Sequence, residues 1–472
     1  MSLKISLHYY ITDSLLPQRD GVNLAHENIR DLLNDQPSES ELEVSFHDFN
    51  SLLKCDHYAL EQLKDCDCVI SNVGPHAHYY YYLRQKLGLK FKIIRDARTS
   101  LWSSYLLQEY LIAPYLRDSD ILLVASHFTQ YLYEYIFPHL KGCSIQICYP
   151  LFKGFPNILP PKATNSRNKQ TTAIGYVGRL SDDKNFPDLI SLLINLNTAG
   201  CGKFKLIACG DVYSKSCNIT TIKDRLIKEL GNDSNFEYLP ARSNKHIWEV
   251  YNQFDILLFP STSSLETLGR VLIEASYAQI PILTGSHAAA PELINESSLC
   301  NVNYFYDRNY KTHFDHSLGK IDISALYKKI INKDFELSQC HLKYVLHSSK
   351  FFDLLKNSSM SSDKYIENSL HQKQVDFVQS ISISIPKIQD IYTNQCSIEL
   401  MSQWFLDLQD TKSYAWPTKV KQLLKMSPFP ERTQRYINKS MITNGDFTNV
   451  GGVDIELCHL LSFYPSFSLL RP

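Results

Sequence analysis

Apolar residues recur along the first 300 positions in short runs that begin after an acidic residue and end in small or polar residues. The pattern repeats in CDCVISNVG (66–74), DSDILLVAS (118–126) and QFDILLFPS (253–261). A continuous, β-branched run of this length between turn-forming residues is typical of a strand buried on both faces of a parallel sheet. Further runs of this kind are LKISLHYY, FKIIRD, AIGYVGR, FKLIACGD and IPILTGS.

Helical periodicity occupies the stretches between these strands, at 23–35, 187–200, 221–231 and 246–254. Strands that alternate with helices predict a doubly wound α/β architecture. Residues 152–172 are rich in Pro, Asn, Lys and Thr and have no apolar period, so they are interpreted as a linker. We therefore expect two α/β domains, at 1–152 and 170–305, and a C-terminal extension at 306–472. Within the extension, 337–358 and 397–409 look helical.

Composition narrows the classes of function. Lys and Arg together number 48 against 49 for Asp and Glu, so the net charge of −1 gives no electrostatic signature of a nucleic-acid partner. The 12 cysteines are scattered without a CxxC pair, which argues against a zinc site. No apolar stretch approaches the ~20 residues that span a bilayer, which leaves only peripheral membrane contact open. Free thiols and no apparent secretory leader favour a cytoplasmic location.

Two DxD triplets, Asp65–Asp67 and Asp118–Asp120, resemble the metal-binding motif of many sugar transferases. Ligands of open α/β sheets bind at the carboxyl ends of the strands. Here an apolar run follows each triplet, so the acids stand at strand entrances, on the opposite edge. We therefore predict no metal site.

The segment 173–190 combines the end of a strand with the start of a helix. The strand ends at Gly178, Arg179 leads a loop that carries Lys184, and Asn185 is placed to cap the next helix, with Pro187 in its first turn. Two cations beside a helix N-terminus favour an anion site, with a diphosphate as the natural ligand. The alternative is a solvated loop whose cations pair with the two aspartates before Lys184.

The segment 254–285 places two glutamates eight positions apart. Glu266 follows a strand and a Ser/Thr-rich loop, while Gly269 permits close approach of a ligand to the N–H groups of Leu268, Gly269 and Arg270. A helix start there would attract a pyrophosphate. Glu274, further along the helix, could then accept a ribose, with Glu266 facing a sugar. An amphipathic helix with two solvated acids is the alternative.

The motifs GRLSDDKN, FDILLFPS and ETLGRVLIEA, in this order and spacing, resemble the nucleotide-sugar domain of family 4 (group 1) retaining glycosyltransferases of the GT-B fold. The resemblance covers about residues 173–294. It implies two Rossmann-like domains facing a cleft, the first for the acceptor and the second for the donor. It also implies that Arg179 and Lys184 bind the donor diphosphate, Glu274 the ribose and Glu266 the donor sugar. The resemblance further implies that the sugar is transferred with retention of anomeric configuration. We also expect that the enzyme needs no metal ion and no cofactor.

Several positions depart from the family pattern. The family commonly has glycine at Gln279, a turn that the chain could re-shape, and paired glycines where Ala289 and Ala290 precede Glu292. The first strand–helix loop has one glycine, Gly21, where the family commonly has two. Arg98, with Asp96 nearby, stands where a histidine is usual. His76, His78 and the four tyrosines after them could line an acceptor pocket, although such a tyrosine run more often serves packing and the surface.

These residues form the predicted site. The candidate catalytic residues are Glu266, Arg179, Lys184 and Arg98, and the candidate substrate-binding residues are Gly21, His76, Gly178, Leu268, Gly269, Arg270 and Glu274.

The sequence thus predicts a hexosyltransferase-like enzyme that uses a UDP- or GDP-sugar and an acceptor of unknown kind: glycan, lipid, small molecule or protein. With no second carboxylate evident in the first domain, same-face transfer is preferred to double displacement. The rivals are a GT-B nucleotide-sugar epimerase or lyase and a non-catalytic nucleotide-sugar-binding scaffold. A dehydrogenase is disfavoured because no G-x-G-x-x-G follows a strand.

Overall fold

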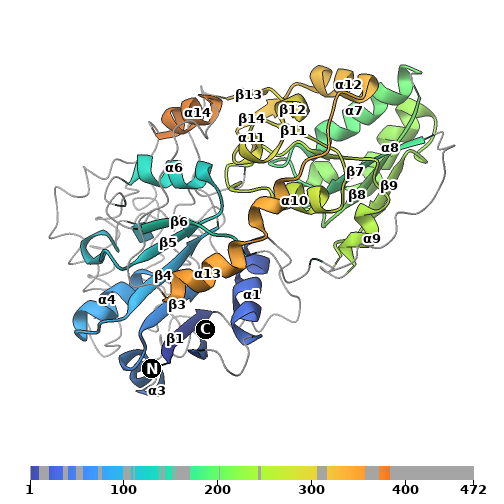
Figure 1. Ribbon diagram of the computed structural model, residues 1–472. Coiled ribbons are helices and arrows are strands. Elements are labelled where there is room, and N and C mark those ends of the chain that lie inside the picture. Colours follow the sequence, from blue (N-terminus) through green and yellow to red (C-terminus); the bar gives the residue numbers. More distant parts are fainter. Residues whose placement is uncertain are drawn as a thin grey trace, which may run out of the picture.

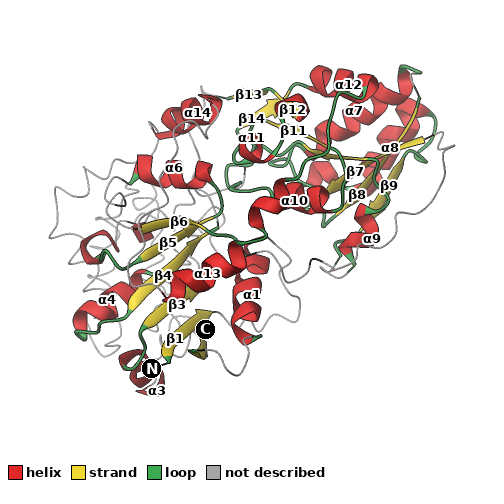
Figure 2. Cartoon of the chain, viewed as in Figure 1, coloured by secondary structure: helices red, strands yellow, loops and turns green. Residues whose placement is uncertain are grey.

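The computed structural model describes residues 2–9, 21–35, 41–48, 57–72, 77–98, 108–109, 112–137, 140, 144–150, 155, 171–200, 202–242, 246–305, 316–356 and 372–382. Within these residues the chain forms two six-stranded parallel sheets, each flanked by helices (Figures 1 and 2). The doubly wound α/β fold predicted from the sequence is confirmed.

The sheet of the first domain has the strand order β2-β1-β3-β4-β5-β6. Its strands are β1 (Leu3–Tyr9), β2 (Leu42–Asp48), β3 (Cys68–Asn72), β4 (Lys92–Ala97), β5 (Ile121–Val124) and β6 (Ser144–Ile147). Its helices are α1 (Gly21–Asn34), α3 (His57–Lys64), α4 (His78–Lys86) and α6 (His127–Ile136), with the 3₁₀ turn η2 (Ala113–Tyr115). Strands β3, β4 and β5 are buried along their whole length, as expected for the inner strands of a parallel sheet, although β4 carries the charged residues Lys92, Arg95 and Asp96.

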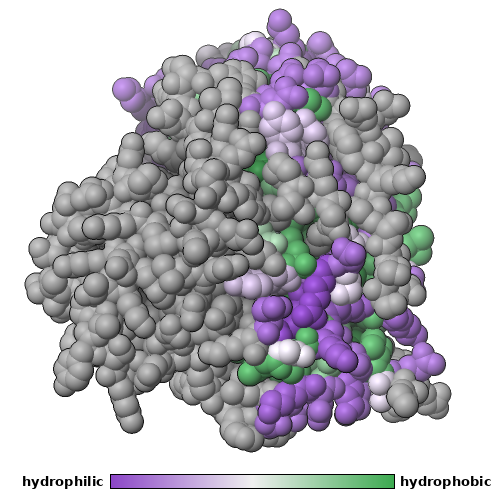
Figure 3. Space-filling model, turned by 90° about the vertical axis from the view of Figure 1, so that its left-hand side faces the viewer, coloured by the Kyte–Doolittle hydropathy of each residue, from purple (hydrophilic) through white to green (hydrophobic). Residues whose placement is uncertain are grey.

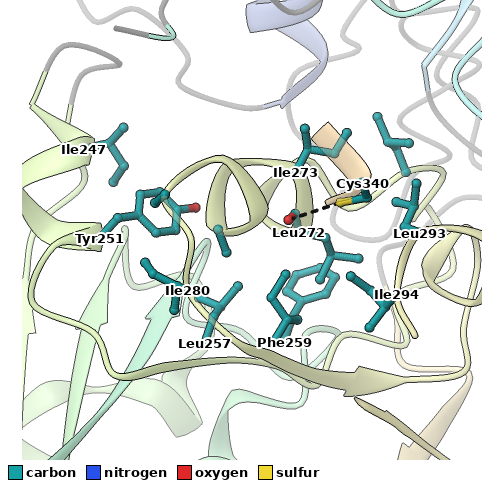
Figure 4. Close-up of a cluster of buried hydrophobic side chains, with 14 of the residues drawn as sticks. Ile247, Tyr251, Leu257, Phe259, Leu272, Ile273, Ile280, Leu293, Ile294 and Cys340 are labelled. Atoms are coloured by element: carbon teal, nitrogen blue, oxygen red, sulfur yellow. Dashed lines mark hydrogen bonds between the residues drawn. The ribbon is translucent and has the colours of Figure 1, made fainter. Parts of the chain in front are cut away.

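The sheet of the second domain has the order β12-β11-β10-β7-β8-β9. Its strands are β7 (Thr171–Val177), β8 (Lys203–Cys209), β9 (Phe236–Leu239), β10 (Ile256–Phe259), β11 (Ile282–Gly285) and β12 (Leu299–Cys300). Its helices are α7 (Phe186–Thr198), α8 (Ile219–Leu230), α9 (Ile247–Tyr251), α10 (Arg270–Tyr277) and α11 (Ala290–Leu293), with the 3₁₀ turns η4 (Lys215–Cys217) and η5 (Glu296–Ser298). Figure 4 shows Leu272 of α10 packed among side chains of β10, and Cys340 donates its thiol hydrogen to the Leu272 carbonyl at 3.6 Å.

The second domain continues beyond residue 305. Strands β13 (Val302–Tyr304) and β14 (Gly319–Ile321) pair antiparallel, and helix α12 (Ile323–Asn332) follows them. Ile321, Leu326 and Ile330 lie in the same hydrophobic cluster as residues of β7 and α7. Part of the segment expected as an extension therefore completes the core of this domain.

The chain then returns to the first domain. After η6 (Cys340–Tyr344), helix α13 (His347–Lys356) buries Phe351, Leu354 and Leu355 in one cluster with Ile5 of β1. The ammonium of Lys92, at the start of β4, donates to the carbonyls of Leu354 and Leu355 at 2.8 and 2.7 Å and so caps α13. The second domain is thus inserted between β6 and α13 of the first (Figure 1).

The last helix of the described residues, α14 (Gln372–Ser382), packs on α6 and contacts both domains. The ring of Phe377 stacks on Tyr304 of the second domain at a centroid distance of 4.7 Å and lies 6.3 Å from Phe128 of the first. The Gln374 amide donates to the carbonyl of Ala288. These contacts make α14 a bridge between the domains.

Several expectations at the level of elements needed revision. Strands β2, β6, β9 and β12 were not anticipated, because their runs are short or only half apolar. Tyr80 and Tyr81 of α4 are buried in a hydrophobic cluster with Leu63, Val69 and Ile93, which agrees with the packing alternative, and the acceptor role stays a prediction. The stretch 397–409 lies outside the described residues.

Two features of the described part of the chain concern contact with a membrane. No helix in that part is long and apolar enough to cross a bilayer. On the face drawn in Figure 3 the described residues are mainly hydrophilic, and hydrophobic ones occur in small separate groups. No disulfide joins the cysteines that the structure describes.

Candidate functional site

Lys184 and Glu266, 82 positions apart, meet where the strands β7 and β10 end. Lys184 stands on the loop before α7 and Glu266 on the loop before α10. The ammonium nitrogen Nζ lies 2.5 Å from Glu266 Oε2, with the two side chains 16% and 14% exposed. The structure therefore joins the residue predicted for the diphosphate to the residue predicted for the sugar.

The Glu266 carboxylate is held by further donors. Ser261 Oγ donates to Oε2 at 3.2 Å, and the backbone N–H of Gly269 donates to Oε1 at 3.1 Å. Burial alone would raise the pKa of Glu266, but the charge and hydrogen bond of Lys184 outweigh it and lower the pKa below its ordinary value. Glu266 is therefore ionised at neutral pH.

Helix α10 begins between Glu266 and Glu274, as predicted from the sequence. This placement is needed if the two glutamates have different roles. Gly269 is the N-cap residue of α10 with φ +76°, and a Cβ there would lie 3.1 Å from Leu272 and 3.3 Å from Phe259. Glu266 consequently lies in the loop and Glu274 in the helix. The Leu268 side chain is buried in the core, so only its backbone is available to a ligand.

Glu274 is buried and already has two partners. Its Oε2 accepts from the Tyr251 hydroxyl at 2.7 Å, and its Oε1 accepts from Arg270 Nε at 2.7 Å. The guanidinium of Arg270 also lies 5.9 Å from the centroid of Phe155. A ribose at Glu274 would have to share or replace these hydrogen bonds, and this role stays a prediction.

The side chain of Arg179 is more exposed to solvent than that of Lys184. Its side chain is 34% exposed, lies 3.4 Å from the Asp183 carboxylate and stacks over the ring of Tyr213 at 4.8 Å. The preceding Gly178 has φ +139°, and a Cβ on the neighbouring Gly210 would lie 1.8 Å from the Gly178 carbonyl oxygen. This close approach of two loops accounts for Gly210, after β8, while the positive φ favours glycine at Gly178, after β7.

Asn185 stands at the N-cap position of α7 but does not cap the helix with its side chain. Its backbone is left-handed, with φ +53°. Its amide nitrogen instead donates to the carbonyl of Pro260 at 3.0 Å and to the hydroxyl of Thr262 at 2.8 Å. The hydrogen bonds of Asn185 therefore connect the loop that carries Lys184 to the loop that carries Glu266.

His287 is a site residue that the sequence reasoning missed. It is buried after β11, with Nε2 3.0 Å from the Ser263 carbonyl and Nδ1 3.1 Å from the Tyr304 hydroxyl. Burial lowers its pKa to about 4, so the ring is neutral at physiological pH. The available signal was a histidine directly after a buried strand, on the ligand-binding edge of the sheet.

Arg98 lies at the end of β4 in the first domain, as expected. Its guanidinium donates to Asp96 at 2.6 Å and to the Cys148 carbonyl at 3.1 Å, and it stacks over Tyr149 at 4.4 Å. Burial, followed by the charge of Arg98, lowers the pKa of the adjacent His26 to about 3. Arg98 is therefore part of a buried charged cluster with a neutral histidine.

The remaining first-domain candidates are less informative. Gly21 begins α1, and His76 lies outside the described residues. Among the described residues no group of three His, Cys, Asp or Glu side chains could hold a metal ion. Asp67 and Asp120 serve local structure, since Asp67 accepts the N–H of Lys4 at 2.9 Å and Asp120 pairs with buried Arg84 at 2.6 Å.

The two domains are joined beside the site by polar contacts. The Thr267 hydroxyl donates to the Arg98 carbonyl at 3.0 Å, and Ser126 Oγ donates to the Thr267 carbonyl at 3.0 Å. Glu292 accepts from the N–H groups of His127 and Phe128, at the N-terminus of α6, at 3.0 and 2.8 Å. Burial raises the pKa of Glu292 to about 7 although these hydrogen bonds oppose the change.

Comparison with known proteins gives a family match and similar folds. Residues 161–313 match the family described as Glycosyl transferases group 1. The lipopolysaccharide outer core galactosyltransferase WaaB, in its apo form, superposes with a TM-score of 0.50 at 17% identity, over 75% of this chain and 99% of that one. Anabaena Alr3699/HepE in complex with UDP also gives 0.50, at 14% identity over 80% and 100% of the two chains. No curated protein matches the sequence. The two solved structures establish the GT-B fold.

Proposed function

We propose that this protein is a glycosyltransferase that moves a hexosyl unit from a UDP- or GDP-sugar to an acceptor hydroxyl, with retention of configuration and without a metal ion. The observation that carries the proposal is the contact of Lys184 with Glu266 where β7 and β10 end. It places a fixed cation and an ionised carboxylate side by side, next to two helix starts.

The pair suits the charges that develop during sugar transfer. An ammonium group has three N–H donors, and among the described residues Glu266 is the partner of one of them. The others would bind phosphate oxygens and stabilise the leaving diphosphate, assisted by the N-terminus of α7. Ionised Glu266 would stabilise positive charge on the sugar ring.

Retention is proposed through transfer on one face of the sugar. The bond from the anomeric carbon to the phosphate oxygen breaks, and the acceptor oxygen forms its bond to the same face. The leaving phosphate oxygen takes the acceptor proton, so atoms and charge balance without an enzymic nucleophile. Support for the reaction class comes from the group 1 match over the donor-side domain and from the GT-B fold.

A panel of UDP-, GDP- and ADP-sugars, read by thermal shift, should identify the donor, because ligand at ~100 times Kd stabilises by about 2.7 kcal/mol. UDP is the first probe, since the Anabaena relative is a UDP complex. Transfer to acceptors should then persist in EDTA. Activity lost on chelation and restored by manganese would contradict the metal-free proposal.

Two outcomes would favour the rival functions. Conversion of the donor without any acceptor would indicate an epimerase or lyase, and donor binding without turnover would indicate a scaffold.

The role of Lys184 is tested by substitution. Lys184→Ala should weaken binding of UDP in the panel, whereas Lys205→Ala should not. Lys205 is a matched control because it pairs with Glu237 at the surface of the same domain, at 2.6 Å.

A further inference from the structure

Thr267 ties the loop that carries Glu266 to the first domain. Its side chain is 6% exposed. Its hydroxyl donates to the Arg98 carbonyl, after β4, and its own carbonyl accepts from Ser126, after β5, each at 3.0 Å. One residue of the second domain therefore contacts the ends of two adjacent strands of the other domain.

Both partners of Thr267 are fixed within the first domain. Ser126 is the N-cap of α6 and accepts the N–H of Thr129 at 3.2 Å, which leaves its hydroxyl proton to be donated. Arg98 is held through its guanidinium by Asp96 and the Cys148 carbonyl. Thr267 thus meets a rigid surface, and the two hydrogen bonds define one relative placement of the domains.

The neighbouring residue, Glu266, shares a peptide unit with Thr267. Its carboxylate is positioned by Lys184 Nζ, by Ser261 Oγ and by the Gly269 N–H within the second domain. Because the peptide unit between the two residues is planar, a shift of Thr267 moves the backbone of Glu266 with it and disturbs the three hydrogen bonds of the carboxylate.

We infer that Thr267 is a positioning residue that makes the placement of Glu266 depend on contact between the domains. When the domains separate, both Thr267 hydrogen bonds break and the Glu266 loop loosens. When they meet, the loop and the carboxylate are fixed for reaction. The inference rests on the proposed function in one respect, namely that Glu266 acts on the donor sugar.

The test replaces the Thr267 hydroxyl with a methyl group of the same shape, Thr267→Val. Its control is Thr284→Val, which removes an equally buried hydroxyl that donates to the Phe259 carbonyl at 2.7 Å within the second domain. Thr267→Ser keeps the hydroxyl and should restore the wild-type behaviour.

The Gly269 N–H is the reporter, because it donates to Glu266 Oε1. Its hydrogen exchange should accelerate about fivefold in Thr267→Val, the factor that one neutral hydrogen bond supplies. It should not accelerate in Thr284→Val or Thr267→Ser. With the UDP- or GDP-sugar found in the panel, kcat should fall about fivefold while UDP affinity stays unchanged.

The inference would be overturned if the Gly269 N–H exchanged at the same rate in Thr267→Val and Thr284→Val. It would also be overturned if Thr267→Val lost UDP affinity and kept its kcat. If the wild type turns over no nucleotide sugar, the proposed function fails, yet the exchange comparison still decides whether Thr267 positions Glu266. Reading exchange and turnover separately therefore distinguishes the two failures.

Discussion

Gln279 ends helix α10 in a conformation that suits glycine. Its backbone has φ +54°. The N–H of Ile280 donates to the Ala275 carbonyl at 2.9 Å, and the N–H of Gln279 donates to the Ser276 carbonyl at 3.1 Å. These two bonds define a Schellman motif, in which the left-handed residue is usually glycine. The turn therefore has the left-handed conformation that glycine adopts most easily, although the residue in it is Gln279.

Replacing Gln279 with glycine should stabilise the second domain. A left-handed residue with a side chain costs about 1–2 kcal/mol, and the greater freedom of glycine in the unfolded chain offsets about 0.5–1 kcal/mol of this. We expect a net gain of about 0.5–1 kcal/mol, or about 1–4 °C in Tm. Gln279→Ala is the reference variant, because it removes the outer side chain and keeps the backbone cost.

Urea unfolding of both variants, followed by a probe in the second domain, measures the difference. Nucleotide-sugar turnover should not change, since Gln279 lies at the end of α10 opposite Glu266. The reasoning is refuted if Gln279→Gly is no more stable than Gln279→Ala.

Three further predictions concern the site. Arg179→Ala and Lys184→Ala should each weaken UDP binding by roughly 1.5–3 kcal/mol, the range for hydrogen bonds to charged groups; unchanged affinity in calorimetry for both would remove the diphosphate site. Glu266→Gln should lower turnover by about 10²-fold with UDP affinity nearly intact, whereas Glu274→Gln should weaken UDP and the donor alike. Identical behaviour of the two glutamine variants would mean that the glutamates have no separate roles. For Glu292, burial raises the pKa from 4.5 to about 7, so its contribution to stability is present below about pH 4.5 and is lost as the pH rises through 7. The stability of the wild type relative to Glu292→Gln should therefore fall by about 1–2 kcal/mol between pH 5 and 8, after allowance for partial exposure, and a flat or rising difference in urea titrations would contradict this.

Much of the fold could be predicted because strands buried on both faces leave an unambiguous apolar run. Strands β3, β5 and β10 were found in this way. By contrast, β2 is only partly buried along its length. Its alternation of polar and apolar residues is the pattern of a half-buried strand, and a criterion based on continuous apolar runs does not detect it. Helix α14 could not be assigned a place, because its partners lie on two domains and local periodicity does not report them.

The sequence indicated where the candidate site residues lie along the helices and loops. It did not indicate which hydrogen bonds join them. The spacing of Glu266, Gly269 and Glu274 sufficed to place the start of α10 between the glutamates. The sequence did not indicate that Lys184 would pair with Glu266 in preference to its neighbouring aspartates. It also did not show that Asn185 would bind the loop after β10 instead of capping α7. Such contacts depend on how two loops meet in space, which separate sequence motifs do not encode.

The insertion of the second domain between β6 and α13 has a consequence for synthesis on the ribosome. The first domain buries Phe351, Leu354 and Leu355 of α13 against its β-sheet, and about 200 residues separate β6 from this helix. At about 5–20 residues per second, synthesis takes roughly 10–40 s to pass from β6 to α13, and the second domain emerges during this time. The second domain should therefore finish folding first, against the usual N-to-C order. Limited proteolysis of a chain that ends at residue 344 should find the second domain resistant and the first domain cleaved.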